Sequence, residues 1–418
     1  MIREIEEYVN GLEIIDTHEH LAPFEKERPK RDFYGEFLYH YFCVDLVSAG
    51  LAEEDLEIVR NGELSALEKW DIVEKFWDRC RFTGYGQALS AIAKDIYGID
   101  EINRQTVGLL NKEFLKTYQT EHYKKILKEK CNIKVAILDY ASETMECDSD
   151  FFVMANRIDP LVCPGSISEI RKLESDTGVT INTFENYLSA CEARIHQFAQ
   201  KSKILKCGLA YDRSLYFERA EKCEAEKEFN RLFSALAAEN NSGECRLDTA
   251  FSDYVFHYVL EIAQKQDMIL QIHAGIQEGN GNILRNSDPV LLNRVFLEYP
   301  KMKFDIFHIG YPYQSELGVI CKMFPNVHVD MCWAHSVSPI AAQRTLSEWL
   351  EFMPYTKIHG FGGDSCFIDG TYGHLTMARK NIAEVLSSKV EQKLFSLDTA
   401  LKIGKALLYD NPAEFFGL

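Results

Sequence analysis

The chain has 418 residues, and 46% of them are hydrophobic, which is enough for a large buried core. Its 46 lysine and arginine residues stand against 64 aspartate and glutamate residues, so the formal net charge at pH 7 is -18. A surface this acidic repels phosphate backbones and anionic lipids, which argues against nucleic acid and membranes as partners.

Short apolar runs recur along the chain, and each is followed by polar turn residues and a helical pattern. The runs cover residues 12–17, 134–139, 151–155, 204–209, 268–272, 304–307, 327–331 and 357–362. Near-continuous apolar runs fit strands of a parallel sheet that is covered on its outer face. Strands that alternate with helices in this way predict an α/β fold of the (β/α)8 TIM-barrel type. A doubly wound open sheet is the structural alternative.

Helices are predicted between the runs. Residues 183–201 and 250–266 each place apolar side chains on one face at helical spacing. Asp288 followed by Pro289 predicts an N-cap and a first helical position, which would open a helix that runs towards Pro300.

The connection between the first and second runs is unusually long. It is predicted to be helical, because Ser65 and Glu68 have capping-box spacing and tryptophans follow at helical intervals. We expect residues 1–21 and 131–418 to form the barrel and residues 22–130 to be a helical insertion. Attached to the end of the first strand, the insertion would pack at the barrel mouth as a wall or a lid.

Twelve cysteines are scattered along the chain without a CxxC pair. Dispersed cysteines in a long chain are typical of reduced core residues rather than a disulfide framework. The acidic amphipathic start does not resemble a signal peptide, and no apolar run has the length of a membrane span. We therefore expect a cytoplasmic protein.

A His-x-His pair closes the first run. Residues two apart share a face of an extended strand, so His18 and His20 are expected to point the same way and to share one metal ion. The pair alone is a weak signal, because such pairs also arise by chance.

Three further polar residues each end an apolar run and precede a turn. His273 ends the fifth run, His308 the sixth and Asp364 the eighth. Barrel enzymes keep their sites at the C-terminal ends of the strands, so these side chains and the His-x-His pair would converge on one pocket. A single histidine of this kind is more often a core residue bonded to a backbone carbonyl, but the combination predicts a metal site.

This set resembles the metal site of the amidohydrolase superfamily. The resemblance covers nearly the whole chain except the helical insertion, and it is strongest to the amidohydrolase-2 group, which contains decarboxylases, lactone hydrolases and relatives of uronate isomerase. Residues 408–416 look like the terminal helix of that group, and uronate isomerases likewise carry a helical insertion after the first strand.

The resemblance implies that His18, His20, His273 and Asp364 bind a divalent metal ion, one zinc or manganese. The ion would lower the pKa of a water molecule and polarise the substrate. Asp364 would accept the proton of that water and pass it to the leaving group. His308 would polarise the substrate, move a proton or bind a second ion, so Asp364 and His308 are the expected catalytic residues.

Lys206 lies in the fourth run, where many two-metal amidohydrolases have a carboxylated lysine. It precedes the likely strand end, so we expect a lysine that binds an anionic substrate or lines the barrel, and a site with one metal ion. Tyr211 and Arg213 follow, and the Arg213 guanidinium would either grip a substrate carboxylate or form a surface ion pair. Tyr311 lies after the sixth run.

The seventh run is followed by Trp333 and His335, which with Lys206, Tyr211 and Tyr311 are candidates for contact with substrate.

Several reactions suit such a site. The first is hydrolysis of a C–O or C–N bond, as in a lactone or an amide, in a small carboxylate-bearing substrate. The alternatives are uronate-type aldose–ketose isomerisation, with Asp364 or Tyr311 as the base, and decarboxylation. A metal-free barrel that binds a sugar acid or a protein is disfavoured by the complete ligand set. We expect a role in carbohydrate metabolism, a small-molecule substrate and, as an open alternative to a monomer, a homo-oligomer.

Overall fold

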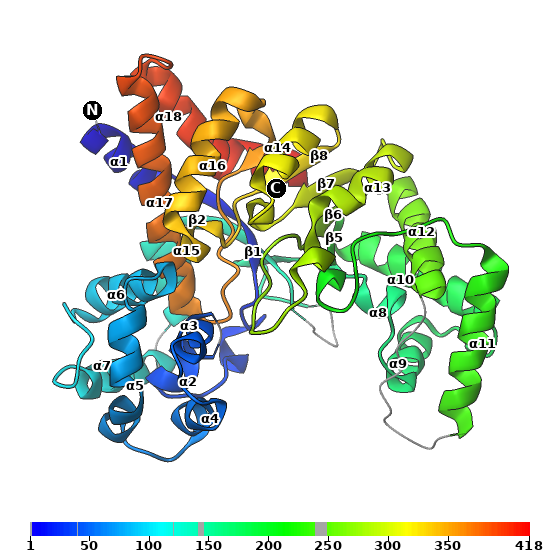
Figure 1. The fold of residues 1–418 in the computed structure, drawn as a ribbon, viewed down its shortest axis with the longest axis horizontal. Helices are drawn as coiled ribbons and strands as arrows, with labels where there is room; N and C mark the ends of the chain where they lie inside the picture. Colours follow the sequence, from blue (N-terminus) through cyan, green and yellow to red (C-terminus); the bar gives the residue numbers. More distant parts are fainter. Residues whose placement is uncertain (1, 40, 120, 141–145, 239–248) are drawn as a thin grey trace. The chain divides into compact units, whose positions relative to one another are not determined.

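The computed structural model describes residues 2–39, 41–119, 121–140, 146–238 and 249–418. The chain divides into two compact units. The first unit comprises Met1–Val153, Ile276–Asn282 and Asp330–Leu418, and the second comprises Met154–Gly275 and Ile283–Val329. Each unit contains parallel strands and the helices that connect them (Figure 1).

The first unit is built around two parallel strands that pair with each other. Strand β1 (Ile14–Glu19) pairs in parallel with β2 (Ile133–Leu138), and β3 (Phe152–Met154) lies on the other side of β2. All six residues of β1 are buried, including its polar half. A strand with no exposed face must satisfy its polar side chains inside the protein.

The last strand of the chain lies beside the first. Beyond β9 (Ile358–His359), the Thr17 N–H donates to the carbonyl oxygen of Phe361 at 3.2 Å, and the Thr17 hydroxyl donates to the same oxygen at 2.9 Å. The two strands are therefore joined just beyond the end of β9.

Helices surround these strands within the first unit. Outside the long connection they are α1 (Ile2–Gly11), α15 (Ala334–Val337), α16 (Pro339–Phe352), α17 (Ile368–Glu391), α18 (Leu397–Lys405) and α19 (Asn411–Phe416). A π-helical turn, Ala406–Asp410, leads from α18 into α19.

The connection after β1 is helical, as predicted. Its helices are α2 (Phe33–Phe37), α3 (Phe42–Ser48), α4 (Glu53–Asn61), α5 (Ala66–Cys80), α6 (Gly84–Tyr97) and α7 (Val107–Lys116). The predicted capping box opens α5: the Glu68 N–H donates to the Ser65 hydroxyl, and the Ser65 N–H donates to the Glu68 carboxylate at 2.8 Å.

This helical segment has a core of its own and also packs on α17. Phe37, Trp70 and Phe114 are buried in its aromatic cluster. A Cβ atom on Gly373 of α17 would lie 2.8 Å from Ile92 of α6, so a glycine allows the two helices to approach closely. Figure 1 shows α6 beside α17.

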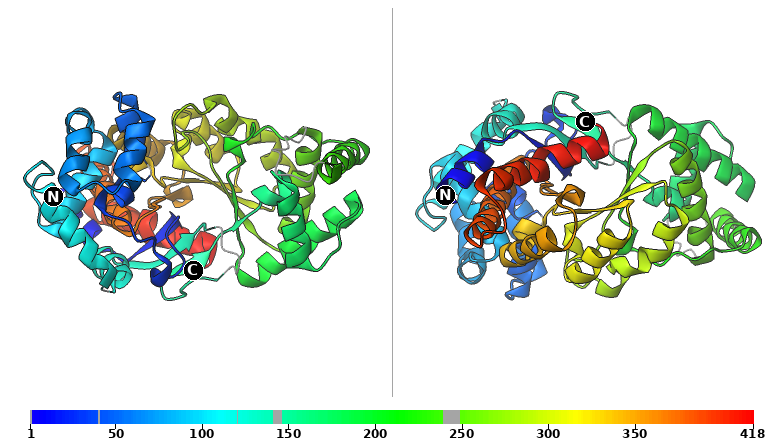
Figure 2. Two further views of the ribbon diagram at one scale, coloured as in Figure 1. Left: turned by 90° about the horizontal axis from the view of Figure 1, so that it is seen from below. Right: turned by 90° about the horizontal axis from the view of Figure 1, so that it is seen from above.

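The second unit contains parallel strands that follow one another in chain order. They are β4 (Asn156–Arg157), β5 (Ile204–Cys207), β6 (Ile269–Ile272), β7 (Lys303–Ile306) and β8 (Val327–Asp330), of which Asp330 belongs to the first unit. Every residue of β5 and β6 is buried, which explains their near-continuous apolar runs. The third predicted run, residues 151–155, corresponds to β3 and ends directly before β4. Figure 2 shows these strands side by side within the unit, in green to yellow.

Helices alternate with the strands of the second unit. They are α8 (Asp159–Val162), α9 (Ile167–Thr177), α10 (Phe184–Lys201), α11 (Lys222–Ala238), α12 (Thr249–Lys265), α13 (Asn293–Glu298) and α14 (Gln314–Met323). Helices α10 and α12 confirm the two predicted amphipathic helices. The Asp288 side chain caps Val290 N–H at 2.9 Å as predicted, but the first turn, Pro289–Leu292, is a 3-10 turn that precedes α13.

Parallel strands that alternate with helices confirm the predicted α/β fold class, and a helical segment follows the first strand as predicted. The cysteines that the structure describes are free thiols, and Cys245 lies outside the described residues. In the described part of the chain, no helix has both the length and the apolar character to span a membrane.

Candidate metal centre

His18 and His20 lie at the C-terminal end of β1 with their rings close together. The ring centroids are 4.8 Å apart and the ring planes are nearly perpendicular, at 89°. The His18 side chain is fully buried, whereas the His20 side chain is 25% exposed. The predicted shared face of the two histidines is therefore present.

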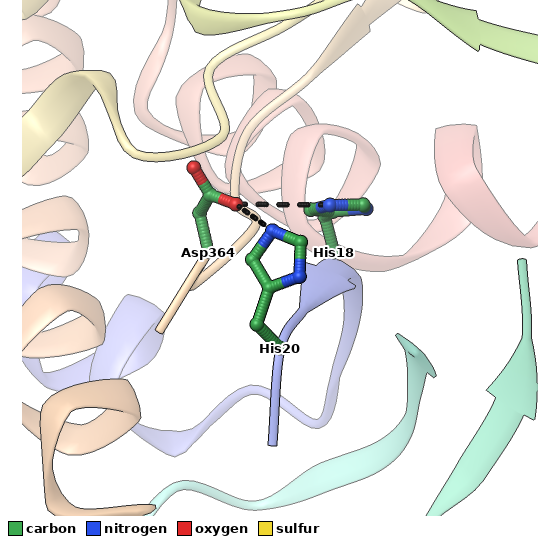
Figure 3. Close-up of side chains that lie close together, drawn as sticks. All are labelled: His18, His20 and Asp364. Carbon is green, nitrogen blue, oxygen red and sulfur yellow. Dashed lines mark ion pairs between the residues drawn. The ribbon is translucent and has the colours of Figure 1, made fainter. Parts of the chain in front are cut away.

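Asp364 completes a three-residue cluster with them (Figure 3). Its Oδ1 atom lies 3.2 Å from His20 Nε2 and 3.7 Å from His18 Nε2. Ligand atoms held about 2.1 Å from a tetrahedral ion lie about 3.4 Å from one another. Two imidazoles and a carboxylate are also donors that zinc and manganese accept, so the cluster fits a divalent metal ion.

Asp139 also belongs to this cluster, although the sequence analysis did not single it out. Its Oδ2 atom lies 3.6 Å from His18 Nε2, and its backbone carbonyl oxygen lies 2.7 Å from His20 Nδ1. The carbonyl accepts the Nδ1 proton, which leaves Nε2 of His20 to face Asp364. Asp139 ends the second apolar run, so it carries the same signal as His273 and Asp364.

The backbone that carries Asp364 is tied to β1. Asp364 has a left-handed φ of 49°, which is costly for a residue with a side chain. The N–H groups of three successive residues donate to β1: Gly363 to Asp16 Oδ1 at 3.0 Å, Asp364 to the His18 oxygen at 2.7 Å and Ser365 to Glu19 Oε2 at 2.8 Å. A Cβ on Gly363 would lie 1.9 Å from Glu19 Oε1, so only glycine fits at that position.

Asp16 and Glu19, which accept those N–H groups, form a buried carboxyl pair. Burial raises the pKa of Asp16 to about 7 and the pKa of Glu19 well above its usual range. Desolvation by burial is the main cause of both shifts, and the charge of Asp16 raises the pKa of Glu19 further. The pair therefore braces the Asp364 loop without placing two negative charges in the core.

Trp333 packs beside this loop within the first unit. Its ring centroid lies 5.0 Å from that of Tyr41 and 6.2 Å from that of Tyr85, and its backbone N–H donates to the carbonyl oxygen of Gly362. Trp333 is 3% exposed, so its predicted contact with substrate stays a prediction.

His335 is buried behind the same loop. Its Nε2 lies 3.0 Å from the Gly360 carbonyl oxygen, and the Asn381 amide lies 3.2 Å from its Nδ1. Burial lowers the pKa of His335 to about 4, so the ring is neutral at pH 7. These contacts support the backbone at Gly360, and the predicted substrate contact of His335 stays a prediction.

The other two predicted histidines form a pair in the second unit. His308 Nε2 lies 3.0 Å from His273 Nδ1, and both side chains are buried. The ring of Tyr211 lies 4.7 Å from that of His273. His308 has a left-handed φ of 60°, as Asp364 has in the first unit. The convergence of this pair with the first cluster stays a prediction, because each unit is described by itself.

Lys206 lies within β5 and is 2% exposed. Its ammonium group sits over the Phe307 ring, 3.9 Å from the centroid. A buried ammonium over an aromatic face is a favourable cation–π arrangement, which fits the lysine that lines the barrel. Its role towards substrate stays a prediction.

Arg213 forms an ion pair in the second unit. Its Nη2 lies 2.6 Å from Asp253 Oδ1, and the same nitrogen donates to the Tyr216 carbonyl oxygen at 2.8 Å. The side chains of Arg213 and Asp253 are only 12% and 7% exposed, so the pair is largely buried rather than on the surface. Tyr311 is partly buried and directly follows the turn that begins at His308.

Comparison with known proteins gives partial matches over the chain. Residues 222–418 match the family model Amidohydro_2, described as amidohydrolase. The chain is 27% identical to Protein fluG of Emericella nidulans over 199 residues, which are 46% of this chain and 22% of that protein. It is 24% identical to the uronate isomerase of Caldanaerobacter subterraneus subsp. tengcongensis over 310 residues, which are 66% of this chain and 60% of that protein. The match thus spans less than two thirds of either relative.

Among solved structures, the uronate isomerase of Thermotoga maritima is similar in fold. The TM-score is 0.82 at 18% sequence identity, and the alignment covers 99% of this chain and 97% of that chain. At this level of identity the likeness shows a shared fold, and the shared fold extends over the helical segment between β1 and β2.

Proposed function

Because this chain is a relative of the amidohydrolase superfamily, with uronate isomerases among its relatives, we propose that it is a metal-dependent enzyme that acts on a small, carboxylate-bearing substrate. The observation that carries this proposal is the cluster of His18, His20 and Asp364 at the end of β1.

The proposed ligands of one divalent ion, zinc or manganese, are His18, His20 and Asp364, with His273 as a further ligand. When bound, such an ion polarises a carbonyl or hydroxyl group and lowers the pKa of water. The carbonyl oxygen of Asp139 holds the Nδ1 proton of His20, which fixes the tautomer that a ligand needs.

The carboxylates of Asp364 and Asp139 are the groups in this cluster that can take up and return a proton. Both are nearly buried, and both face the imidazoles of His18 and His20. A carboxylate in this position can accept a proton from a substrate that binds beside His18 and His20. His308 is proposed as a second proton-transfer or polarising group.

Among the reactions that such residues support, we favour isomerisation of a uronate between aldose and ketose. This step removes a proton from C2, returns a proton to C1 and moves the carbonyl group from C1 to C2, so it needs a base near both carbons. The uronate isomerase relative and the shared fold favour this reaction, and Asp364 is the proposed base.

Hydrolysis of a lactone or an amide is the second candidate. It is favoured by the presence of two carboxylates, Asp139 and Asp364, beside the imidazoles, because one could act as a ligand while the other accepts a proton from water. We place either reaction in the cytoplasm and in carbohydrate metabolism.

Metal analysis is the first test of the proposal. Purified protein should contain close to one divalent ion per chain, and His20→Asn should lose it. His196→Asn, on the exposed face of α10, is the matched control and should keep the ion. The proposal would be wrong if the purified wild type contained no metal and its unfolding temperature did not change on adding Zn²⁺ or Mn²⁺.

The reaction is then assigned with a substrate panel followed by NMR. Ketose signals from a uronate support isomerisation, and ring opening or release of an amine supports hydrolysis. Release of CO2 would instead assign decarboxylation and contradict both proposed reactions.

A further inference from the structure

The carbonyl groups of the Asp364 loop are held as completely as its N–H groups. The carbonyl oxygen of Gly363 accepts a hydrogen bond from His374 Nδ1 of α17 at 2.6 Å. The carbonyl oxygen of Asp364 accepts one from the Tyr41 hydroxyl, and that of Ser365 accepts one from the His20 backbone N–H at 3.0 Å. Together with the donations to β1, each of the six backbone polar groups at 363–365 has a partner on another element. Such a loop cannot rotate one peptide without breaking a buried hydrogen bond.

One of these partners comes from the helical segment 22–130. Tyr41 lies between α2 and α3, is 5% exposed and is itself held at a left-handed φ of 59°. Its hydroxyl donates to the backbone oxygen of Asp364, a residue 323 positions further along the chain. Both Tyr41 and Asp364 therefore have a backbone conformation that is unfavourable for a residue with a side chain. Residues in such conformations cluster at functional sites.

The ring of Tyr41 is fixed by its neighbours. Its centroid lies 5.0 Å from that of Trp333, 5.7 Å from that of Tyr85 and 5.8 Å from that of His374. Rings packed at these distances restrict the side chain to one rotamer, so the hydroxyl has a defined position before any metal arrives.

We propose that Tyr41 is a positioning residue of the metal centre, which holds the left-handed backbone of Asp364 so that its carboxylate faces His18 and His20. The proposal rests on the proposed function, because it needs Asp364 to be a metal ligand. It gives the helical segment a role in the metal centre. The segment completes the geometry of the ligand set without supplying a ligand.

The expected effect follows from how the loop would respond to losing the hydroxyl. Without the donor, the buried oxygen of Asp364 has lost a partner, and the peptide can turn to relieve the left-handed φ. That turn moves the carboxylate away from the imidazoles. Groups that orient metal ligands typically account for about 10- to 100-fold in metal affinity.

Tyr41→Phe is the test variant and Tyr34→Phe is its control. Tyr34 is also a buried tyrosine of the helical segment, and its hydroxyl donates to the Ala66 backbone oxygen at 2.8 Å, remote in sequence from the Asp364 loop. Both variants remove one buried hydroxyl that bonds a carbonyl. A general loss of stability should therefore be similar in the two proteins.

Metal binding is measured on the apoproteins by titration with Zn²⁺ and with Co²⁺, whose visible absorption reports ligand geometry. Tyr41→Phe should bind at least about 10-fold more weakly than the wild type and change the Co²⁺ spectrum, whereas Tyr34→Phe should match the wild type in both. If the wild type binds no metal, the proposed function fails. If the wild type binds metal and Tyr41→Phe is identical to it, only the role of Tyr41 fails.

A second measurement covers the case in which Tyr41→Phe does not fold. In a crystal structure of the metal-loaded wild type, the Tyr41 hydroxyl should remain bonded to the Asp364 oxygen while the Asp364 carboxylate binds the ion. A Tyr41 side chain that has left the Asp364 oxygen, with the ion still bound, would overturn the proposal.

Discussion

His20 Nδ1 lies 2.7 Å from the backbone carbonyl oxygen of Asp139, and the opposite ring nitrogen lies 3.2 Å from the carboxylate of Asp364. One ring thereby connects the end of β2 with the loop that follows β9. A backbone acceptor survives any substitution at Asp139 that preserves the fold. The orientation of His20 and the contribution of the Asp139 carboxylate can therefore be tested separately.

Asp139→Asn should weaken metal binding while leaving His20 in place. The substitution keeps the carbonyl that orients His20 but removes the negative charge 3.6 Å from His18 Nε2. We expect a loss of about 10- to 100-fold in affinity, measured by calorimetric titration with Zn²⁺. Asp55→Asn, on the exposed face of α4, is the control. Unchanged affinity in Asp139→Asn would remove this carboxylate from the centre.

Asp364→Asn should abolish activity more completely than it disturbs the fold. It removes both a proposed ligand and a proton acceptor, and proton transfer by a placed side chain contributes about 10²- to 10⁴-fold to a rate. Turnover of the substrate found in the NMR panel measures the loss, with the exposed Asp398→Asn as control. Retention of wild-type kcat with a full metal content would rule out the proposed role of Asp364.

Gly363→Ala should destabilise the protein by about 1–3 kcal/mol, because the new methyl group would overlap Glu19 Oε1 in a closely packed region. Gly108→Ala in α7 is the matched control. A Cβ there has no atom within 4 Å, so this helical substitution should stabilise by about 0.4–1 kcal/mol. Urea unfolding measures both. Equal stabilities for the two variants would contradict the described contact.

The buried imidazole of His335 should make the protein sensitive to acid. Its pKa is lowered to about 4 from the ordinary 6.5, so between these pH values the unfolded chain binds a proton that the folded chain does not. This contribution to stability is present above pH 6.5 and is lost as the pH falls towards 4, by about 3 kcal/mol in all.

Carboxyl groups also change the free energy of unfolding in this pH range. Comparing the wild type with His335→Gln separates the contribution of His335 from theirs. The free energy of unfolding of the variant should fall less steeply than that of the wild type as the pH drops from 6.5 to 4. His196→Asn, which replaces an exposed histidine, should keep the wild-type slope. Parallel curves for wild type and His335→Gln would contradict a neutral buried ring.

The sequence predicted those parts of the centre that depend on local pattern. The alternation within β1 placed His18 and His20 on one side, and the end of an apolar run marked Asp364. Asp139 also ends an apolar run, and that position is the one local signal for it in the sequence. The capping box at Ser65 could also be predicted from local pattern, because its hydrogen bonds join residues three positions apart.

Other features depend on tertiary placement and left no local signal. Nothing in the sequence around Tyr41 indicates that its hydroxyl meets the backbone of Asp364. The left-handed φ of Asp364 is likewise imposed by the surrounding hydrogen bonds, since aspartate adopts it at a cost. The ion-pair partner of Arg213 is Asp253, which lies 40 positions away on α12, and no local pattern indicates that contact.

The bond between Asp16 Oδ1 and the Gly363 N–H spans 347 positions of the chain. During synthesis, His18 and His20 leave the ribosome long before the residues that complete their cluster exist. Contacts of such high sequence separation form late and slowly in folding. An ion that binds this centre tightly would therefore meet a nearly finished molecule, and metal uptake would report the last stage of folding rather than its beginning.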